Sequence, residues 1–479
     1  MSEFFQPSIF TSSVNAAWIV VVYLLALLNV VKILRDEMNP TAATAWILVN
    51  LSFPLIGVPL YYFLGQNKLK GYSKRRRATQ SIYSSQREAQ KLEHLIKNNA
   101  KDDEKDDVPQ NMILVKPSFN EIAILDDGTR AFREIFQAIS QAKTFILVQY
   151  YIFRPDRLGR HFKDLLMERA KHGVQIFFIF DNLGSFGMTA RYLRDLKKAG
   201  VHVARFLPFH VRFNLQINYR NHRKLVVVDG HTAFVGGMNV GTEYLGKTRF
   251  WRDTQLKIQG PAIIQLMDTF LDDWNFAVRG KRRYLPLKYF RHATQLERGK
   301  IPTRVISFGP GDQLAIGLYL FMHLIQLANK RIIIATPYFI PDVVLERCLE
   351  LALQRGVEVT LIIPQKPDHW FIKPISHVSI RRFAKAGGRV FLYENGFMHQ
   401  KVMLIDDLHA LIGTSNFDNR SIYLNFETCL VMSEQGFAGQ VAQMLQKDLQ
   451  ESRPLDPKEH ESTSYLILAN LARLLAPLF

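Results

Sequence analysis

The chain has 479 residues, 48% of them hydrophobic and 12% aromatic, which excludes an intrinsically disordered or fibrous protein and allows two domains' worth of buried core. Its formal net charge of +18 favours an anionic partner, either nucleic acid or the surface of a membrane rich in acidic lipid. Charge alone does not choose between these two partners.

Two apolar stretches open the chain, at residues 16–31 and 42–64. Each is about 20 residues long, which at ~1.5 Å per residue crosses a hydrocarbon layer of about 30 Å. A signal peptide is disfavoured, because no Lys or Arg precedes Lys32 and no small-residue cleavage site follows the first stretch. We therefore expect a hairpin of two transmembrane helices within residues 1–66, kinked at Pro54 and Pro59, with a buried helical hairpin as the alternative.

A dense basic cluster follows the second apolar stretch: Lys68, Lys70, Lys74, Arg75, Arg76 and Arg77. The loop between the two stretches carries far fewer basic residues, so the positive-inside rule places both termini and the soluble body in the cytosol. Basic side chains so close to a bilayer also attract anionic headgroups, at roughly 1 kcal/mol each. Residues 67–110 are therefore interpreted as a basic juxtamembrane segment and a charged linker, with the sequence KDDEKDD at residues 101–107.

Helical and strand patterns alternate through the rest of the chain, which predicts an α/β fold. In the first half, strands are expected at residues 144–153, 174–180, 201–206, 225–228 and 232–235, with helices around residues 135–139, 162–171 and 193–198. In the second half, strands are expected at residues 332–340, 357–363, 390–393, 402–405 and 410–412, with helices around residues 318–329, 344–354 and 381–386. This repetition indicates an internal duplication, with halves at residues 111–285 and 286–461 and an amphipathic segment at residues 462–479.

Four polar residues recur at the same spacing in both halves. The two copies are His222, Lys224, Asp229 and Asn239, and His399, Lys401, Asp406 and Asn416. A single His-x-Lys pattern is expected roughly once by chance in a chain of this size, whereas two copies that share four positions are not explained by coincidence. The repeated motif is therefore the expected centre of function.

Local geometry predicts what each copy presents. The apolar runs at residues 225–228 and 402–405 are expected to be buried strands, in which side chains two residues apart share a face, so each His and Lys can meet one ligand. The Asp lies an odd number of residues from its His and opens a turn into the next strand. We therefore expect a hairpin that sets position 238 or 415 opposite the His, brings the Asn beside it, and leaves the Asp to brace the turn.

The motifs resemble the signature of the phospholipase D superfamily, which is His-x-Lys, four residues, Asp, six residues and Gly-Ser/Gly-x-Asn. Both copies fit, through the sequences GGMN at residues 236–239 and GTSN at residues 413–416. Many members carry Ser after the Gly, where this chain has Gly237 and Thr414, so no hydroxyl is expected there in the first half. The resemblance implies two tandem phospholipase D-like α/β halves that pack about a pseudo-twofold axis, with both motifs facing a shared active site.

The residue types suit a covalent route through phosphorus. A neutral imidazole is a nucleophile at neutral pH, and a protonated one can donate to the leaving oxygen. The Lys and Asn side chains offer donors to phosphate oxygens in the place that a metal would otherwise take. We therefore predict no metal and no other cofactor. The predicted catalytic residues are His222, Lys224, Asp229, His399, Lys401 and Asp406, with Asn239 and Asn416 as phosphate ligands.

An imidazole nucleophile also needs a partner on its other ring nitrogen to hold its tautomer. In members of the resembled superfamily, an acidic residue some thirty positions after one His has this role. Asp253 and Glu427 occupy the matching places, with ordinary surface ion pairs as the alternative. The residue types do not say which His attacks, and the resemblance favours His222.

Over nearly the whole chain, the sequence looks like the bacterial cardiolipin synthases. Besides the membrane hairpin and basic segment, the similar segments are YYIF at residues 150–153, ATPYFIPD at 335–342 and ARLLAPL at 472–478. This resemblance implies phosphatidyl transfer from one phosphatidylglycerol to another through a phosphatidyl-histidine, with release of glycerol, at the cytosolic side of the bacterial inner membrane. The expected partners are phosphatidylglycerol and the bilayer. A phospholipase or other phosphatidyltransferase is the alternative; nucleic acid is not expected, because a nuclease has no need of an apolar anchor.

Two segments interleave aromatic and basic residues, RFLPFHVR at residues 205–212 and DHWFIK at residues 368–373. Each is expected either to insert into the headgroup layer or to pack on the body of the protein, and the final segment either to lie along the membrane interface or to dock as a last helix. Cys348 and Cys429 lie among mostly apolar neighbours, which predicts buried free thiols and a reducing compartment.

Overall fold

The computed structural model describes residues 9–36, 40–65, 69, 72–73, 76, 117–207, 218–246, 250–278, 299–312, 314–456, 462–474 and 476. The chain forms two units. One comprises Met1–Leu69 with Phe209–Asn218, and the other comprises Lys70–Pro208 with Tyr219–Phe479. The predicted linker at residues 101–107 and residues 208–212 of the first aromatic segment lie outside the described residues.

The first unit contains three helices, α1 (Ile9–Arg35), α2 (Pro40–Ser52) and α3 (Pro54–Leu64). Within the described part of the chain, Ala17–Arg35 is the one stretch that is long and apolar enough to span a membrane by length and composition. The second predicted span is not one continuous helix. It breaks at Phe53, because Pro54 has no N–H to donate and instead begins a new helix, and the two pieces have 13 and 11 residues.

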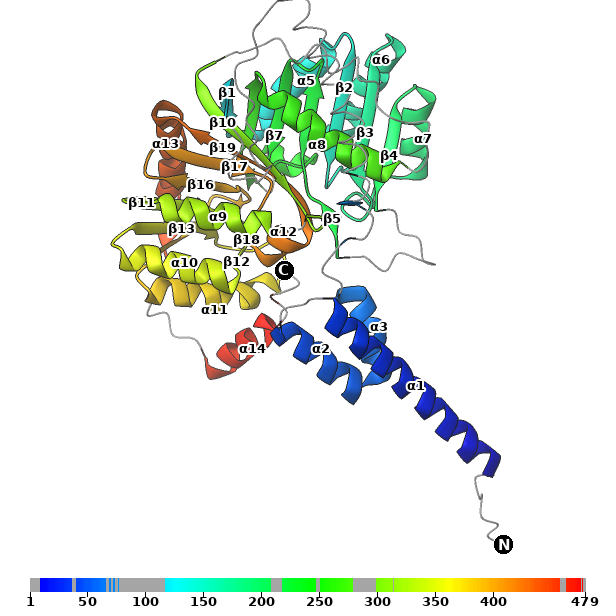
Figure 1. Cartoon of the computed structure of the whole chain (residues 1–479). Helices are drawn as coiled ribbons and strands as arrows, with labels where there is room; N and C mark the ends of the chain where they lie inside the picture. The colour runs from blue at the N-terminus through cyan, green and yellow to red at the C-terminus, as the bar shows by residue number, and fades with distance from the viewer. Residues whose placement is uncertain are drawn as a thin grey trace, which may run out of the picture. The chain divides into compact units, whose positions relative to one another are not determined.

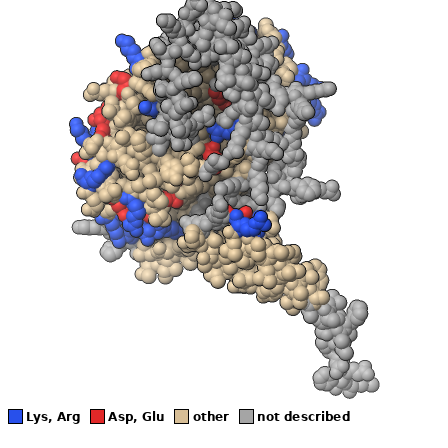
Figure 2. Space-filling model, viewed as in Figure 1, with Lys and Arg blue, Asp and Glu red and all other residues tan. Residues whose placement is uncertain are grey.

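The few polar groups of this unit pair with one another. The side-chain amide of Asn29 in α1 donates to Oδ1 of Asn50 in α2 at 2.7 Å, and both side chains are buried. The hydroxyl of Tyr61 in α3 donates to Asp36 at 2.7 Å. Such bonds tie apolar helices together where no water is available. Elsewhere α1 exposes large apolar side chains, and no Lys or Arg interrupts its tan surface in Figure 2 before its last turn.

The second unit holds both repeated motifs. The elements of its first half are β1 (Ser118–Leu125), α5 (Gly128–Ser140), β2 (Phe145–Tyr150), α6 (Arg157–Lys171), β3 (Gln175–Asp181), α7 (Ala190–Lys198), β4 (His202–Phe206), β5 (Arg220–Asn221), β6 (Leu225–Val228), β7 (Thr232–Gly236), the 3-10 helix η2 (Thr242–Leu245), β8 (Trp251–Arg252), β9 (Gln255–Gln259) and α8 (Ala262–Ala277). Those of its second half are β10 (Ile301–Phe308), α9 (Ile316–Leu327), β11 (Arg331–Ala335), β12 (Phe339–Ile340), α10 (Val343–Gln354), β13 (Glu358–Pro364), α11 (Ile372–Lys385), β14 (Arg389–Tyr393), β15 (Phe397–Met398), β16 (Val402–Ile405), β17 (His409–Gly413), β18 (Phe417–Asp418), α12 (Asn419–Tyr423), β19 (Asn425–Ser433), α13 (Gln435–Gln450), β20 (Ser452–Pro454) and α14 (Thr463–Arg473).

One long sheet runs through both halves, and its strand order repeats (Figure 1). From the centre outward, the first half reads β1-β9-β7-β6-β2-β3-β4 and the second half reads β10-β19-β17-β16-β11-β13-β14, with β20 at the outer edge. The halves join where β1 pairs antiparallel with β10. Each half therefore places its motif hairpin, β6-β7 or β16-β17, at the same point in the order, which confirms the tandem α/β halves.

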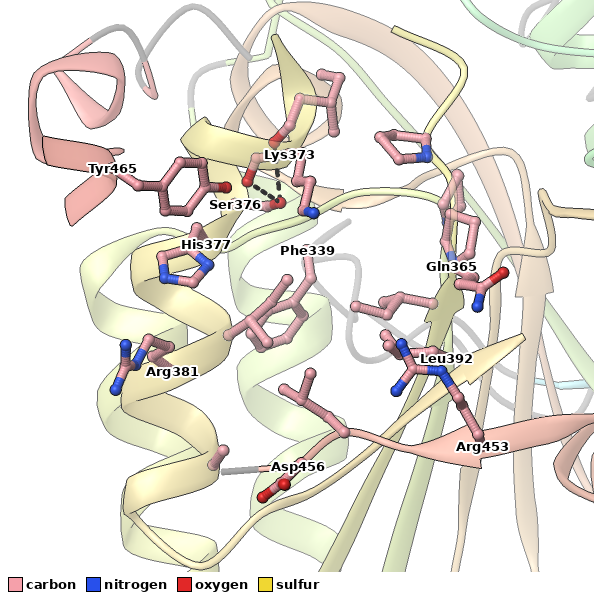
Figure 3. A pocket seen from close by; sticks show the side chains of 18 of the residues that line it. Phe339, Gln365, Lys373, Ser376, His377, Arg381, Leu392, Arg453, Asp456 and Tyr465 are labelled. Carbon is pink, nitrogen blue, oxygen red and sulfur yellow. Dashed lines mark hydrogen bonds between the residues drawn. The ribbon is translucent and has the colours of Figure 1, made fainter. Parts of the chain in front are cut away.

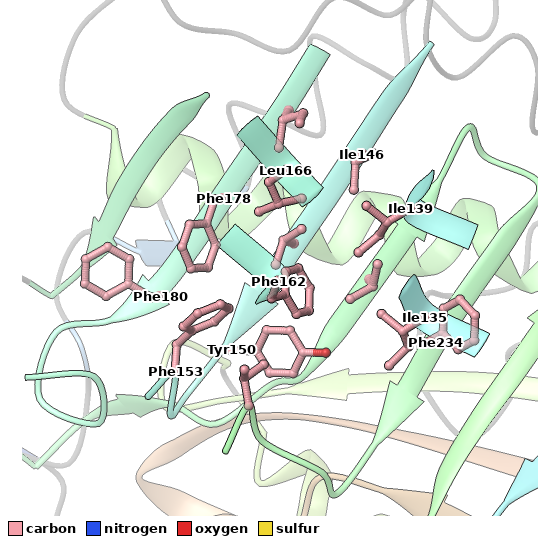
Figure 4. Close-up of a cluster of buried hydrophobic side chains, with 14 of the residues drawn as sticks. Ile135, Ile139, Ile146, Tyr150, Phe153, Phe162, Leu166, Phe178, Phe180 and Phe234 are labelled. Atoms are coloured by element: carbon pink, nitrogen blue, oxygen red, sulfur yellow. The ribbon is translucent and has the colours of Figure 1, made fainter. Parts of the chain in front are cut away.

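Apolar residues of helices and strands interlock on one face of each half. In the first half, α5, α6 and α7 pack their apolar stripes on β2 and β3, with Phe162 and Phe178 fully buried at the centre (Figure 4). In the second half, α9, α10 and α11 form the equivalent cluster with β11 and β13. Helices α8 and α13 pack against other strands of the same sheet, so the motif hairpins lie within layered structure.

Most predicted helices and strands are present, with differences at proline and loop positions. The predicted strand at residues 332–340 ends at Ala335, because Pro337 cannot donate to the sheet, and a short separate strand, β12, follows. The strand predicted at residues 144–153 ends at Tyr150. The boundaries given to the halves stay predictions. Both cysteines are free; Cys429 is buried as expected, and Cys348 is partly exposed.

Parts of the second aromatic segment and of the final segment pack on the body of the protein, and insertion into the headgroup layer stays a prediction. The side chain of Trp370 is 85% exposed, whereas Phe371 packs against the cluster that contains Ile372 and Ile375. Helix α14 packs along α11, and Arg473 forms an ion pair with Glu346 of α10 at 3.2 Å. The outer face of α14 nevertheless remains apolar and exposed.

Candidate active site

The two motif hairpins have the predicted register. In the first, Leu225 pairs with Val235 and Val228 with Thr232, and continuing this pairing sets residue 238 opposite His222. In the second, Val402 pairs with Ile412, which sets residue 415 opposite His399. Both hairpins are buried on both faces, so each His and Lys emerges from the end of a rigid strand.

The motif aspartates lie at the turns, at the other end of these strands. Asp229 accepts hydrogen bonds from the backbone amides of Lys143, Thr144 and Phe145 at 2.7–2.9 Å. Asp406 accepts three equivalent bonds from residues 329–331 at 2.6–2.8 Å. Both adopt a left-handed backbone conformation with φ of 52°. They brace the turns as the odd spacing predicted, so any influence on the imidazoles passes through the strand.

Beside each imidazole, a two-residue strand of one half pairs with a strand of the other half. Strand β5, which precedes His222, pairs in parallel with β19 of the second half, and the His222 amide donates to the Phe426 carbonyl at 3.0 Å. Strand β15, which precedes His399, pairs in parallel with β8 of the first half, and the His399 amide donates to the Arg252 carbonyl at 2.8 Å. Each pairing carries one half's acidic residue to the other half's His.

Each imidazole is consequently bound by a carboxylate of the other half. Nδ1 of His222 lies 2.9 and 3.0 Å from the two carboxylate oxygens of Glu427, and Nδ1 of His399 lies 2.6 Å from Oδ2 of Asp253. Neither carboxylate contacts the His that precedes it by about thirty residues. All four side chains are buried, so these are not surface ion pairs. A carboxylate on Nδ1 fixes the tautomer in which Nε2 carries the lone pair.

The two carboxylates differ in their remaining partners. Glu427 also accepts a short hydrogen bond from the Thr414 hydroxyl and one from Asn425 at 3.2 Å. The residue equivalent to Thr414 in the first half is Gly237, where an added Cβ would lie 2.1 Å from Oδ1 of Asp253. The first half therefore lacks a hydroxyl because Asp253 occupies the space.

Both motif lysines are buried and turned toward the imidazoles. Nζ of Lys224 donates to the backbone carbonyl of His222 at 2.6 Å. Nζ of Lys401 donates to the carbonyl of His399 and lies 3.0 Å from its Nδ1. Burial lowers the pKa of both, that of Lys401 to about 8. Two ammonium groups in a buried setting call for an anionic ligand.

Both motif asparagines are buried, and their place beside the histidines stays a prediction. Oδ1 of Asn239 accepts from the amide of Ile152 at 3.1 Å, and its Nδ2 donates to the Tyr244 hydroxyl at 3.3 Å. Nδ2 of Asn416 donates to Asp418 at 3.1 Å. Burial raises the pKa of Asp418 to about 6. A role for either amide in binding phosphate stays a prediction.

Burial and positive charge keep both imidazoles neutral at pH 7. Burial lowers the pKa of His222 to about 4; Lys224 and Lys401 lower it too, and Glu427 opposes them. Burial lowers the pKa of His399 to about 3, with Lys401 and Lys224 acting in the same direction and Asp253 against them. Each His thus interacts electrostatically with the lysine of the other half.

Sequence analysis missed the side chains that fix the residue between each His and Lys. Asp273 in α8 accepts from Nη1 of Arg223 at 2.7 Å. Asp448 in α13 accepts from Nε2 of Gln400 at 2.8 Å and from Nε of Arg252 at 2.6 Å. Both carboxylates are buried on the sheet-facing side of a helix. An acidic residue within an otherwise apolar helix face was the available signal.

Aromatic rings around the histidines were also missed as site residues. The Tyr151 ring lies edge-on to His222 with centroids 5.0 Å apart, and Nζ of Lys224 lies 5.5 Å from the same ring. The Trp251 ring lies 4.8 Å from that of His399. These rings restrict water at the imidazoles and leave little freedom to rotate.

Within the described residues, no cluster of three or more His, Cys, Asp or Glu side chains is arranged to hold a metal ion. The positive charge that a metal would bring to a phosphate is available from Lys224 and Lys401.

Comparison with known proteins agrees with this arrangement. The family model described as "Cardiolipin synthase, PLD-like domain" matches residues 135–274 and 321–449, and "Phospholipase_D-nuclease N-terminal" matches residues 21–66. The chain is 34% identical over 471 residues to "Major cardiolipin synthase ClsA" of Bacillus subtilis (strain 168), covering 94% of this chain and 96% of that protein. It is 40% identical over 366 residues to "Cardiolipin synthase A" of Pseudomonas aeruginosa (strain LESB58), covering 75% of this chain and 73% of that protein. Phosphatidylserine synthase from Haemophilus influenzae Rd KW20 has the same fold, with a TM-score of 0.62 at 16% identity, covering 77% of this chain and 98% of that one. The chain is therefore a phosphatidyltransferase that belongs to the cardiolipin synthase family, with two phospholipase D-like halves.

Proposed function

We propose that the two motifs form one active site, which transfers a phosphatidyl group between two phosphatidylglycerol molecules to give cardiolipin and glycerol. The observation that carries this proposal is the exchange of carboxylates: His222 is held by Glu427, and His399 by Asp253. Two imidazoles that each depend on the other half are expected to act on one phosphorus atom. The relatives named cardiolipin synthase support the choice of substrate.

In the first step, Nε2 of His222 attacks the phosphorus of one phosphatidylglycerol. The phosphorus–nitrogen bond forms as the bond to the glycerol oxygen breaks, and His399 gives that oxygen its proton. Glycerol leaves, and a phosphatidyl-histidine remains. His222 is assigned as the nucleophile because its Nδ1 is held by both oxygens of one carboxylate, whereas Nδ1 of His399 also lies near Lys401 and Tyr244.

In the second step, His399 accepts the proton of the terminal hydroxyl of another phosphatidylglycerol. The hydroxyl oxygen attacks phosphorus, the phosphorus–nitrogen bond breaks, and both imidazoles return to their starting protonation states. The same intermediate would yield phosphatidic acid if water were the acceptor. Partly buried rings such as Tyr151 and Trp251 favour the lipid alcohol by restricting water.

The charges at the site fit an anionic phosphodiester. Lys224 and Lys401 are positioned to donate to its nonbridging oxygens and to stabilise charge that grows in the transition state. Burial is the main cause of the low pKa of His399, and the lysines add to it; a bound phosphate offsets the lysine charges and so raises the pKa of this imidazole toward that of a general acid. Substrate binding therefore prepares the general acid.

The chain is further proposed to be anchored in the bacterial inner membrane, with the catalytic unit in the cytosol. The apolar stretch Ala17–Arg35 and the match of residues 21–66 to the N-terminal family model support the anchor. Helices α2 and α3 together would make the second crossing of a hairpin, broken at Phe53. The basic cluster after α3 supports the cytosolic side by the positive-inside rule.

The test measures lipid products from labelled phosphatidylglycerol by thin-layer chromatography. His222→Ala and His399→Ala are each expected to abolish cardiolipin formation, whereas His172→Ala, which changes an exposed His on α6, is expected to retain it. Wild-type turnover in either motif variant would refute the two-histidine mechanism. A parallel incubation with an oligonucleotide is expected to show no cleavage; cleavage without lipid transfer would favour a nuclease.

A further inference from the structure

A cavity lies in the outer part of the second half, apart from the motif residues. It has a volume of about 490 Å³, within the range of pockets that take small ligands. Its walls come from α11, from β13 and β14 with the loop after β13, and from the start of α14 (Figure 3). None of its lining residues belongs to either His-x-Lys motif.

The cavity wall is largely apolar. Phe339, Ile380 and Leu392 line it, and Figure 3 shows Phe339 between the helix that carries His377 and the strand that carries Leu392. Other apolar lining residues are Pro337, Ile363, Pro364, Pro367, Ile372, Ala384 and Leu455. These apolar side chains make up half of the lining residues and offer a hydrocarbon chain a surface to pack on.

Basic side chains border this wall. They are Lys373, Arg381, Lys385 and Arg453, and the one acidic lining residue is Asp456. Arg453 already pairs with Glu394 at 3.3 Å. Within the described residues, neither Lys373 nor Lys385 forms an ion pair, and both are exposed. Figure 2 shows Lys and Arg side chains on the side of the body where Figure 1 places α10 and α11. The border of the cavity is therefore positively charged and suited to bind an anionic group.

An exposed apolar row lies on α14, the helix that also contributes a residue to the cavity wall. Tyr465 of α14 lines the cavity, and farther along the same helix Ile467, Leu468, Leu471 and Leu474 are all exposed. Their spacing places them on one side of α14, opposite the buried Ala469. A helix with an apolar outer face and basic neighbours is typical of a surface that lies in the headgroup region of a bilayer.

We propose that this cavity binds an anionic phospholipid of the surrounding bilayer, at a site separate from the one that carries out transfer. An acyl chain lies along Phe339, Ile380 and Leu392. The basic side chains at the border, Lys373 at the start of α11 and Lys385 at its end, attract the phosphate. The apolar face of α14 brings the cavity to the lipid surface. The ligand is held without bond breaking, so the inference does not depend on the transfer reaction.

The test is photolabelling of the full-length protein in phosphatidylcholine nanodiscs doped with phosphatidylglycerol that carries a diazirine in one acyl chain. The His222→Ala/His399→Ala background prevents turnover of the probe. Mass spectrometry is expected to find label on peptides from α11 and β14, and unlabelled phosphatidylglycerol is expected to displace it. A failure of lipid transfer in wild-type protein leaves this result unaffected, so the two proposals fail separately.

Two variants and a matched control decide the outcome. Ala384→Trp fills the cavity from α11 and is expected to abolish this labelling. Lys373→Gln/Lys385→Gln is expected to reduce it by about fivefold per lysine, the attraction that one basic residue contributes near an anionic surface. The control Lys366→Gln/Lys447→Gln removes two exposed lysines that do not line the cavity and is expected to change nothing.

Labelling of α11 and β14 that survives Ala384→Trp would overturn the proposal, because the probe would then be reaching these peptides from elsewhere. Equal labelling by a diazirine phosphatidylcholine would overturn the requirement for an anionic lipid. Displacement by inorganic phosphate as strong as that by phosphatidylglycerol would overturn the role of the apolar wall.

Discussion

The exchanged carboxylates make a sharp test of the active site through Glu427→Gln. Glutamine keeps the size and shape of the side chain but carries no charge. Glu427 is fully buried and lies between Nδ1 of His222 and the hydroxyl of Thr414, both of which donate to it. The single amide oxygen of glutamine can serve one of these donors, and its NH2 group then faces the other. If the NH2 faces His222, the ring must carry its proton on Nε2, which leaves no lone pair for attack on phosphorus.

The size of the effect follows from the contact that is lost. A hydrogen bond to a charged group contributes about 1.5–3 kcal/mol, which corresponds to about 10- to 150-fold in rate at about 1.4 kcal/mol per factor of ten. If His222 adopts the wrong tautomer, Glu427→Gln loses more activity than this. We therefore expect kcat to fall by at least about tenfold. Because Glu427 raises the pKa of His222, its removal lowers that pKa further below the value of about 4. The acid limb of kcat/KM, which reports the free enzyme, is therefore expected to move to lower pH.

The assay is the initial rate of cardiolipin formation from labelled phosphatidylglycerol in mixed micelles, measured across pH, with thermal unfolding recorded for each variant. Glu350→Gln, which changes a partly exposed glutamate on α10 that pairs with Arg347, is the matched control and is expected to behave as wild type. If Glu427→Gln keeps kcat within twofold of the control, the carboxylate does not orient the nucleophile. A loss of rate with the acid limb shifted to higher pH would contradict the sign of the electrostatic argument.

Local patterns predicted the fold well where neighbours in sequence are also neighbours in space. The hairpin register around Asp229 and Asp406 follows from a period of two and a short turn, and both hairpins have it. The second membrane span was predicted as one crossing with kinks at Pro54 and Pro59, because a proline in an apolar run does not say whether the helix bends or ends there. Only the backbone shows that Phe53 and Pro54 end one helix and begin another.

Local sequence patterns could not predict which carboxylate binds which histidine. Glu427 is 205 residues from His222, and Asp253 is 146 residues from His399. The resemblance to the phospholipase D superfamily pointed to these two carboxylates, but their assignment to a particular His depends on which half supplies the strand beside β5 and β15. That choice is made by packing between the halves, and no periodicity within either half records it.

Three further predictions test the turns, the metal question and the asymmetry of the halves. Asp406→Asn is expected to lower the free energy of unfolding by about 1–2 kcal/mol at pH 7, since asparagine tolerates the left-handed backbone but accepts weaker bonds. Backbone donors lower the pKa of Asp406, although partial burial opposes them. The stability difference between wild type and variant, measured in urea titrations, should therefore shrink as the pH falls below the ordinary carboxyl pKa. It should be absent once the carboxyl is protonated in the folded state. Dialysis against a chelator is expected to leave cardiolipin formation unchanged; a loss that a divalent ion restores would show a metal requirement. Gly237→Ala is expected to reduce kcat at least tenfold, because the new Cβ would lie 2.1 Å from Asp253 and must push that carboxylate from His399. Gly439→Ala, at a helix position with no atom within 4 Å of the added Cβ, is its control, and equal rates in the two variants would show that Asp253 is free to move.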